Sequence, residues 1–214
     1  MGTPMQLQEM QTEINQLLKS LNVDTPLVFA IDNRKNIASA LGFYVNGTIP
    51  LLNQKVNSTL GFVSVDVDYL NRNLTYDEQK FVLAHETSHI FLNHVVPIAI
   101  DTLVDRLIKY YDPDLHKIVN IVKIFLYLFG VPPPLPFLIK EQELAADVRA
   151  IFLTGNENAA KTCLTKLVGG NLDSCSHTWE ALGIKMPVMT MRERLQGIQQ
   201  KLAEYRQFGY KITF

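Results

Sequence analysis

Two histidines and a glutamate stand close together in the sequence, in the pattern His85-Glu86-x-x-His89. On a helix, residues four apart differ by roughly 40° of rotation, so the two imidazoles point the same way from successive turns. Two such rings form one side of a zinc site. Glu86 lies to one side of them, where it can reach a water molecule on the metal without binding the metal itself. The motif therefore predicts metal-assisted hydrolysis, with Glu86 as general base and then acid.

The residues around the motif predict the helix that carries it. Thr75-x-x-Glu78 is a capping box, which marks a helix start. The helix expected over 75–95 is strongly apolar, with Phe81, Val82, Ala84, Ile90, Phe91 and Leu92. A buried helix that carries His, Glu and His needs groups that satisfy them, and a metal does so. The alternative is a core helix whose two histidines are satisfied within the protein.

A hydrolytic zinc ion usually has three protein ligands and one open position, so a third ligand is needed. His94 lies about 140° around the helix from His89 at 100° per residue, which makes it a poor third ligand. A helix expected over 140–155 is the better source, because Glu143 and Asp147 are four residues apart and share a face. One of them can bind the metal while the other accepts the second N–H of a ligand histidine. An ordinary solvated acidic face is the alternative.

The rest of the sequence predicts one α+β domain over 1–214, in which a small sheet precedes the motif helix. The other expected elements are a helix over 6–21, a sheet over 27–67 (strands 27–31, 36–45 and 61–67, with a surface loop or hairpin tip at 46–59), a helical insertion over 95–139 (helices 95–111 and 115–131), a helix over 158–168, a connection over 169–177, a C-terminal helix over 190–207 and a strand at 209–214. The first of the strands is expected to be buried.

The segment 115–131 is the most apolar part of the chain, but it falls short of the ~20 apolar residues that span a bilayer. We expect it to be a buried helix. The alternatives are a peripheral membrane contact or a contact between subunits through 115–139.

The composition excludes one class of partner and limits others. A net charge of −1 and a pI near 6.5 leave no basic surface for nucleic acid. Residues 1–16 lack the apolar core of a signal peptide, so we expect a cytoplasmic protein, with membrane association as an open alternative. Cys163 and Cys175 are expected to be reduced thiols; a disulfide is an alternative, and zinc binding is disfavoured because C-x-x-C spacing is missing.

Together, these motifs resemble the M48-type gluzincin zinc metallopeptidases, which include the CAAX-prenyl and HtpX-like proteases and the compact, soluble minigluzincins. The resemblance rests on His85-Glu86-x-x-His89 with His94 five residues later, followed by Glu143-x-x-Ala146-Asp147. Softer strand matches extend it over 25–195. It implies a zincin-like (gluzincin) α+β fold, in which a small, mostly antiparallel sheet packs on the motif helix and on the helix that carries Glu143.

The resemblance also implies a role for each matched residue. His85, His89 and Glu143 would bind Zn²⁺, and Asp147 would orient a ligand histidine. An edge strand would pair with an extended substrate; it comprises Ala38, Ser39, Ala40 and Leu41.

One position departs from the family pattern. Relatives often have His-Pro followed by Arg, whereas this chain has Met186-Pro187, with Arg192 or Arg194 after it as the residue that would stabilise the oxyanion. His177 is a candidate to replace the missing histidine.

The sequence thus predicts a zinc-dependent endopeptidase that acts on peptides or proteins. One alternative is a latent form of the same enzyme, in which 115–139 or 209–214 covers the cleft. The other is a zinc-stabilised binding protein without turnover.

Overall fold

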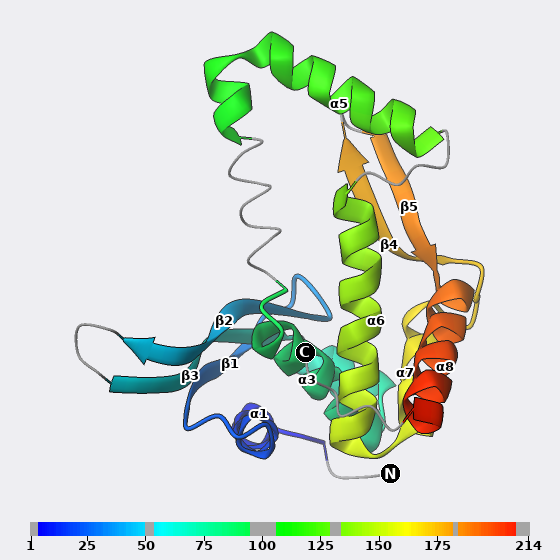
Figure 1. The fold of residues 1–214 in the computed structure, drawn as a ribbon. Helices are drawn as coiled ribbons and strands as arrows, with labels where there is room; N and C mark the ends of the chain where they lie inside the picture. Colours follow the sequence, from blue (N-terminus) through cyan, green and yellow to red (C-terminus); the bar gives the residue numbers. More distant parts are fainter. Residues whose placement is uncertain (1–3, 50–53, 95–105, 129–133, 182–183, 209–214) are drawn as a thin grey trace.

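The structure is a computed structural model, and it describes residues 4–49, 54–94, 106–128, 134–181 and 184–208 (Figure 1). Its helices and strands, in chain order, are α1 (Leu7–Ser20), β1 (Thr25–Asp32), β2 (Ala38–Ile49), β3 (Gln54–Val65), α2 (Val67–Asn73), α3 (Tyr76–Phe91), α5 (Pro113–Leu128), α6 (Pro134–Thr154), α7 (Glu157–Leu167), β4 (Cys175–Ala181), β5 (Ile184–Thr190) and α8 (Met191–Phe208). The architecture is α+β, as predicted. The strand expected at 209–214 and most of the helix expected over 95–111 lie outside the described residues.

The first three strands form a mixed sheet in the order β1-β3-β2. The chain reverses between β1 and β2 and again between β2 and β3, so β2 pairs antiparallel with β3 whereas β1 pairs parallel with it. The β2–β3 ladder runs from Ala38↔Val65 to Ile49↔Gln54. Of the two alternatives for 46–59, the structure agrees with the hairpin tip, because this stretch holds the ends of β2 and β3. The strands are longer than predicted, since pairing continues to Ile49↔Gln54.

One face of the sheet packs on helices. Val28, Val63 and Val65 point from this face into the core, where α1 and α3 contact the strands. Gly42 and Gly61 oppose each other in the β2–β3 ladder, and a Cβ on either would lie 3.2 Å from the side chain of Ile90 on α3. The two glycines therefore let the motif helix lie directly against the sheet, beside the edge strand β2.

The opposite face of the sheet is apolar and exposed. We define this outer sheet face by its large side chains: Leu27, Phe29 and Ile31 on β1, Leu41, Phe43 and Val45 on β2, and Leu60 and Phe62 on β3. The first strand, 27–31, was predicted to be buried, which is wrong for three of its five residues, since Leu27, Phe29 and Ile31 are 45%, 51% and 41% exposed. A run of apolar residues shows that a strand has two apolar faces, but not that both are covered.

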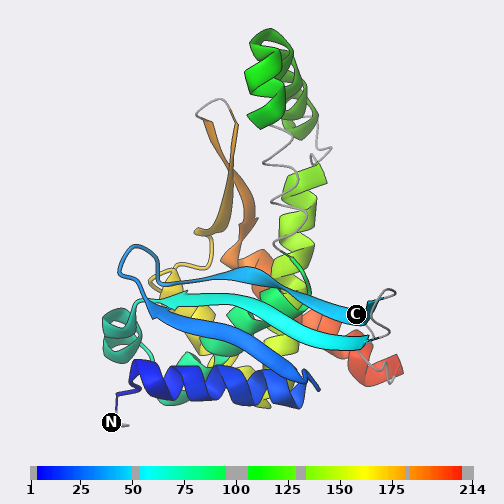
Figure 2. The same ribbon diagram turned by 90° about the vertical axis from the view of Figure 1, so that its left-hand side faces the viewer.

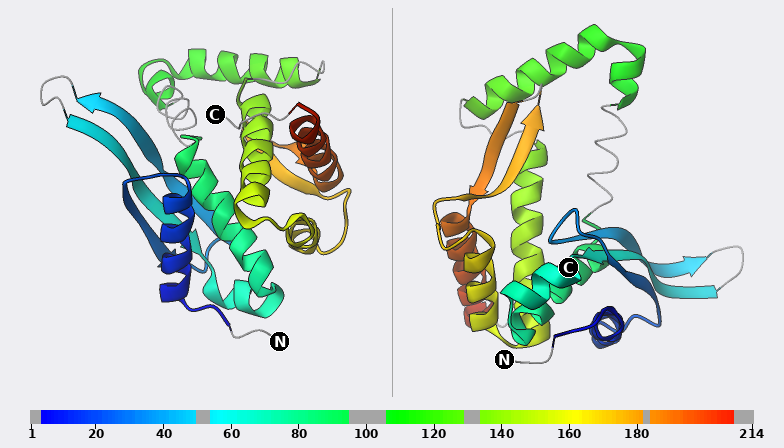
Figure 3. Two further views of the ribbon diagram at one scale, coloured as in Figure 1. Left: turned by 60° about the horizontal axis from the view of Figure 1, so that its bottom comes forward. Right: turned by 180° about the vertical axis from the view of Figure 1, so that it is seen from behind.

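The second half of the chain packs on the side of α3 that faces away from α1. The helix α6 packs on α3, so that α3 lies between α1 and α6 (Figure 3). The helices α7 and α8 and the antiparallel hairpin β4–β5 complete this half. The sequence predicted α7 and α8 but missed α2 and the hairpin, because Ser176, His177 and Thr178 give β4 no apolar alternation.

The helix α5 lies at the end of the β4–β5 hairpin, away from the core (Figure 1). Ile118 and Ile121 are each 57% exposed and Val122 is 50% exposed, so the prediction of a buried helix is wrong for these apolar side chains. Hydrophobicity alone did not reveal that this helix projects from the domain. Within the described ranges, none of the helices has the length and apolar character that crossing a membrane requires.

Candidate metal centre

The motif helix α3 begins at the predicted capping box. The Thr75 hydroxyl accepts a hydrogen bond from the N–H of Glu78 at 3.4 Å, and the Glu78 carboxylate accepts one from the N–H of Thr75 at 2.7 Å. Lys166 of α7 lies 2.7 Å from the same carboxylate. These contacts fix the start of a helix that is buried on nearly all sides, and its burial carries His85 and Glu86 into the interior.

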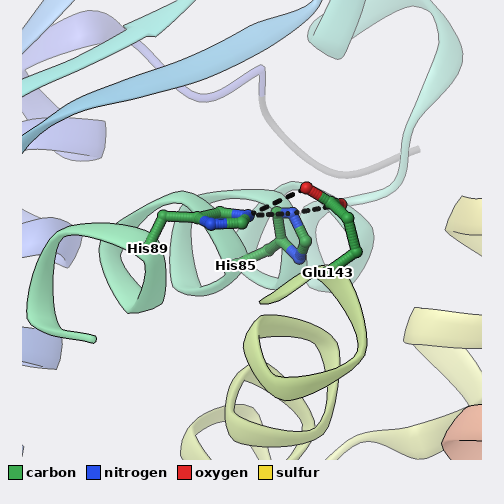
Figure 4. Close-up of side chains that lie close together, drawn as sticks. All are labelled: His85, His89 and Glu143. Atoms are coloured by element: carbon green, nitrogen blue, oxygen red, sulfur yellow. Dashed lines mark hydrogen bonds and ion pairs between the residues drawn. The ribbon is translucent and has the colours of Figure 1, made fainter. Parts of the chain in front are cut away.

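Three side chains from α3 and α6 converge on one point (Figure 4). The Nε2 atoms of His85 and His89 are 3.0 Å apart, and each lies 3.4 Å from an oxygen of the Glu143 carboxylate. In a tetrahedral zinc site with bonds of about 2.0–2.1 Å, neighbouring ligand atoms are about 3.3 Å apart. The spacing of the three donors therefore fits a zinc ion, and their types are those that zinc prefers.

The second ring nitrogen of each of the two histidines lies within hydrogen-bond distance of another side chain. Asp147 Oδ1 lies 2.8 Å from His85 Nδ1, and His94 Nδ1 lies 2.9 Å from His89 Nδ1. This is the usual way in which a protein fixes the ring orientation of metal-binding histidines. The second contact was not predicted. Asn93 has a φ of 55°, which ends the helix and turns His94 back onto His89, so the 100° step no longer applies.

A buried arginine joins the two carboxylates. Arg194 Nε and Nη2 lie 2.6 Å and 2.8 Å from the two oxygens of Asp147, and Nη2 lies 2.9 Å from Glu143 Oε2. Arg192, the other candidate, is exposed and pairs with Asp173 at 2.9 Å, so the structure does not bring it to the site. Two residues apart on α8, the two arginines point in nearly opposite directions.

The charges around His85 favour a cation at this point. Burial alone would lower the pKa of His85, but Asp147 and Glu143 raise it to about 10. Burial would raise the pKa of Glu143, but hydrogen bonds from the two histidines lower it well below its usual range. Burial raises the pKa of Glu86, which makes its carboxylate a stronger base than an exposed one.

The three donors line a cavity of about 470 Å³, which is large enough for part of a peptide. Ala38, Ser39 and Ala40 of the edge strand form one wall and His177 of β4 lies on another. Leu41, the fourth residue of the predicted substrate-binding edge, is not among the residues that line the cavity, and its side chain is 60% exposed on the outer sheet face.

The remaining residues that the sequence singled out are His177 and the two cysteines. His177 Nε2 lies 3.5 Å from Glu143 Oε1, so the structure brings this histidine to the site. It is the candidate replacement for the histidine that relatives often have before the proline, where this chain has Met186 before Pro187. Both cysteines are free thiols, as expected; Cys163 is buried and Cys175 lines the cavity.

Comparison with known proteins places the chain in a family. Comparisons with curated proteins and with solved structures returned no match. The sequence model of Peptidase family M48 matches residues 4–204, which include every element of the site described above. The chain therefore belongs to Peptidase family M48.

Proposed function

We propose that this chain is a zinc-dependent endopeptidase that hydrolyses peptide bonds. The observation that carries the proposal is the convergence of His85, His89 and Glu143 on one point, with Glu86 beside them in the wall of a cavity. Membership of a peptidase family supports the same reaction class.

His85, His89 and Glu143 are the residues that would hold the zinc ion. When bound, zinc supplies Lewis acidity, which lowers the pKa of a water molecule from about 15.7 toward about 7 and polarises a carbonyl group. The Glu86 carboxylate accepts a proton from the attacking water and later delivers it to the nitrogen of the leaving amine, so no external acid or base is consumed.

We assign the remaining two roles, positioning of the carboxylates and stabilisation of the oxyanion, to Arg194 and His177. Nε and Nη2 of Arg194 are directed at Asp147 and Glu143, and Nη1 lies 3.5 Å from His177 Nδ1, so we assign Arg194 the task of positioning these side chains. His177 is half-buried beside the cavity and is the better candidate to donate a hydrogen bond to the oxyanion.

The edge strand β2 offers a way to hold the substrate. Its Ala38–Ala40 segment lines the cavity, and only its other side is paired with β3. An extended peptide can add to such an edge through main-chain hydrogen bonds. This mode orients a scissile bond beside Glu86 without requiring one particular side-chain sequence.

The test is cleavage of a peptide library by the wild-type chain and by Glu86→Gln. The wild type should cleave, and the variant should lose about 10²–10⁴-fold in kcat/KM. Zinc content by elemental analysis should be the same in both, since Glu86 is not a ligand.

Equal cleavage by both chains would refute the role of Glu86. Zinc in both chains with no cleavage by either would instead indicate a zinc-stabilised binding protein.

A further inference from the structure

The outer sheet face is a broad apolar surface made by eight large, exposed side chains of three neighbouring strands. In the sheet register, Phe62 lies between Phe29 and Leu41, and Leu60 lies between Leu27 and Phe43. The rings of Phe29 and Phe62 are 6.1 Å apart, so the side chains form a continuous layer. Figure 2 looks onto this face, and none of the drawn helices crosses it.

The size of this face matches a protein interface. An aromatic side chain has an area of roughly 150–250 Å² and an aliphatic one somewhat less, so three Phe and five aliphatic residues at close to half exposure present on the order of 500–700 Å². The largest apolar patch on a typical monomer is about 300–600 Å², whereas each partner of a standard interface contributes about 800 Å². The area of the face is thus at the upper end of what a monomer leaves exposed and close to what one partner of an interface contributes.

The face also carries no charge. The other residues that point outward from the same stretches of strand are Thr25 on β1, Ser39 on β2, and Ser58 and Ser64 on β3. None of them is ionisable. A surface without ionisable groups meets its own copy without repulsion, and two flat sheet faces pack at about 10 Å as in a β-sandwich. It offers no basic groups for the headgroups of an anionic membrane.

We propose that two copies of this chain associate through the outer sheet face, with the sheets packed face to face about a two-fold axis. The helix α3 and the cavity lie on the other side of the sheet, so the dimer leaves both clefts accessible. The proposal does not depend on the chain being a peptidase.

The experiment is the mass of the full chain in solution at micromolar concentration, by light scattering or sedimentation equilibrium. The wild type should have twice the 24.3 kDa mass of one chain. Phe62→Lys places a charge at the centre of the face and should give a monomer, whereas Phe62→Leu should remain a dimer. Because the contact is apolar, the dimer should not weaken as the salt concentration is raised.

Two controls distinguish the alternatives. Ile118→Lys puts the same charge on the exposed side of α5 and should leave the dimer intact. A monomeric wild type overturns the proposal, as does a dimer that Ile118→Lys dissociates and Phe62→Lys does not.

Vesicle flotation tests the alternative of a membrane contact. If the wild type is a monomer that floats with phosphatidylcholine–phosphatidylserine vesicles, and Phe62→Lys no longer floats, the proposal is overturned in favour of a bilayer. If Phe62→Lys fails to fold, Leu60→Lys repeats the test.

A second, independent observation concerns the open edge of β2. The carbonyl of Ile37 accepts a hydrogen bond from the N–H of Asp66, on the β3 side. Main-chain groups of alternate residues point to opposite sides of a strand, so those of Ala38, Ala40 and Gly42 point to the open edge. At Tyr44 the edge is already occupied.

The side chain of Asn93 forms this contact. The N–H of Tyr44 donates to Asn93 Oδ1 at 2.7 Å, and the Tyr44 carbonyl accepts from Asn93 Nδ2 at 3.0 Å. The carboxamide thus takes the place of the next residue of an added strand. We infer that Asn93 ends the stretch of β2 available to a substrate strand after Gly42; this inference rests on the proposed peptidase function.

The test uses peptides of increasing length and the variant Asn93→Gly. Glycine tolerates the φ of 55° at this position and removes the carboxamide. In the wild type, kcat/KM should stop rising once the peptide reaches Tyr44. In the variant, the ratio of kcat/KM for longer peptides to kcat/KM for short peptides should rise severalfold, whatever the variant does to the cleavage of short peptides.

The outcomes separate this inference from the proposed function. An unchanged length dependence overturns it, and so does a uniform loss at every length, which would indicate a merely structural contact. If neither chain cleaves any peptide, it is the proposed function that fails.

Discussion

Asp147 is the side chain on which the geometry of the site depends most. It is fully buried, it lies 2.8 Å from the ring of His85, and its two oxygens accept hydrogen bonds from Nε and Nη2 of Arg194. Its pKa is held low by Arg194 and His85 although burial would raise it. A neutral residue here would leave a buried arginine short of one counter-charge and a ligand histidine without an orienting partner.

We therefore expect Asp147→Asn to affect stability and metal affinity together. Breaking a buried ion pair costs about 3–5 kcal/mol, and losing the group that orients a ligand weakens metal binding about 10–100-fold. Urea unfolding of the metal-free chain and competition with a zinc chelator measure the two effects. The matched control is Asp173→Asn, which breaks the exposed pair with Arg192 and should change neither quantity. Equal behaviour of the two variants would contradict the assignment.

At the residue scale, the spacing in the sequence identified the converging residues but not all of their neighbours. Helical periodicity put His85 with His89 and Glu143 with Asp147 on shared helix faces, whereas the choice of Glu143 over Asp147 as the ligand came from the family resemblance. The choice between Arg192 and Arg194 required the rotation of α8 about its axis, which a sequence does not specify. The contact of His94 with His89 could not be predicted for a related reason, since the position of His94 depends on the positive φ of Asn93.

At the element scale, the start of α3 links helix capping to pH. Burial alone would raise the pKa of Glu78, but hydrogen bonds from Lys166 and from the Thr75 N–H lower it below the ordinary 4.5. A carboxylate with a lowered folded-state pKa stabilises the fold above pH 4.5, and this contribution is lost as the pH falls through the lowered value.

Glu78→Gln should keep the capping box but lose the ion pair. We expect a cost of about 1 kcal/mol at pH 7 that disappears under acidic conditions, where the wild-type carboxylate is protonated as well. Denaturant unfolding of both chains across the acidic range measures the difference. A difference that stays constant with pH would show that the charge of Glu78 does not contribute.

The contact between α3 and the sheet depends on two glycines. A Cβ on Gly42 would lie 2.5 Å from the Leu60 carbonyl and 3.2 Å from Ile90, so Gly42→Ala should destabilise the fold by about 1–3 kcal/mol. Gly47 lies in the same strand with nothing within 4 Å of its Cβ position, so Gly47→Ala should have little effect. Thermal unfolding of the two variants checks this; equal melting temperatures would contradict the packing described.

Apolar patterning predicted most helices, since capping signals and periodicity are local. It failed for β4–β5 and for the length of the β2–β3 hairpin, where the stabilising partner is another strand. Neither alternation nor turn residues reveal which strands will pair.

At the scale of the whole molecule, the described part of the chain exposes groups of apolar side chains on the outer sheet face and on α5. Both were predicted to be buried, for β1 and for 115–131. The error has one cause: hydrophobicity measures what a side chain gains by leaving water, but not what covers it. The sheet face is broad and uncharged, which is why we assign it to a second copy of the chain.

The central claim is that His85, His89 and Glu143 bind one zinc ion. The most direct test is the zinc content of the purified chain by elemental analysis after exhaustive dialysis. We expect one zinc ion per wild-type chain and loss of most of it in Glu143→Ala. The control Glu141→Ala, two residues away on α6 and paired with Lys201, should retain the ion. A wild-type chain without zinc, or a Glu143→Ala chain that keeps it, would contradict this account.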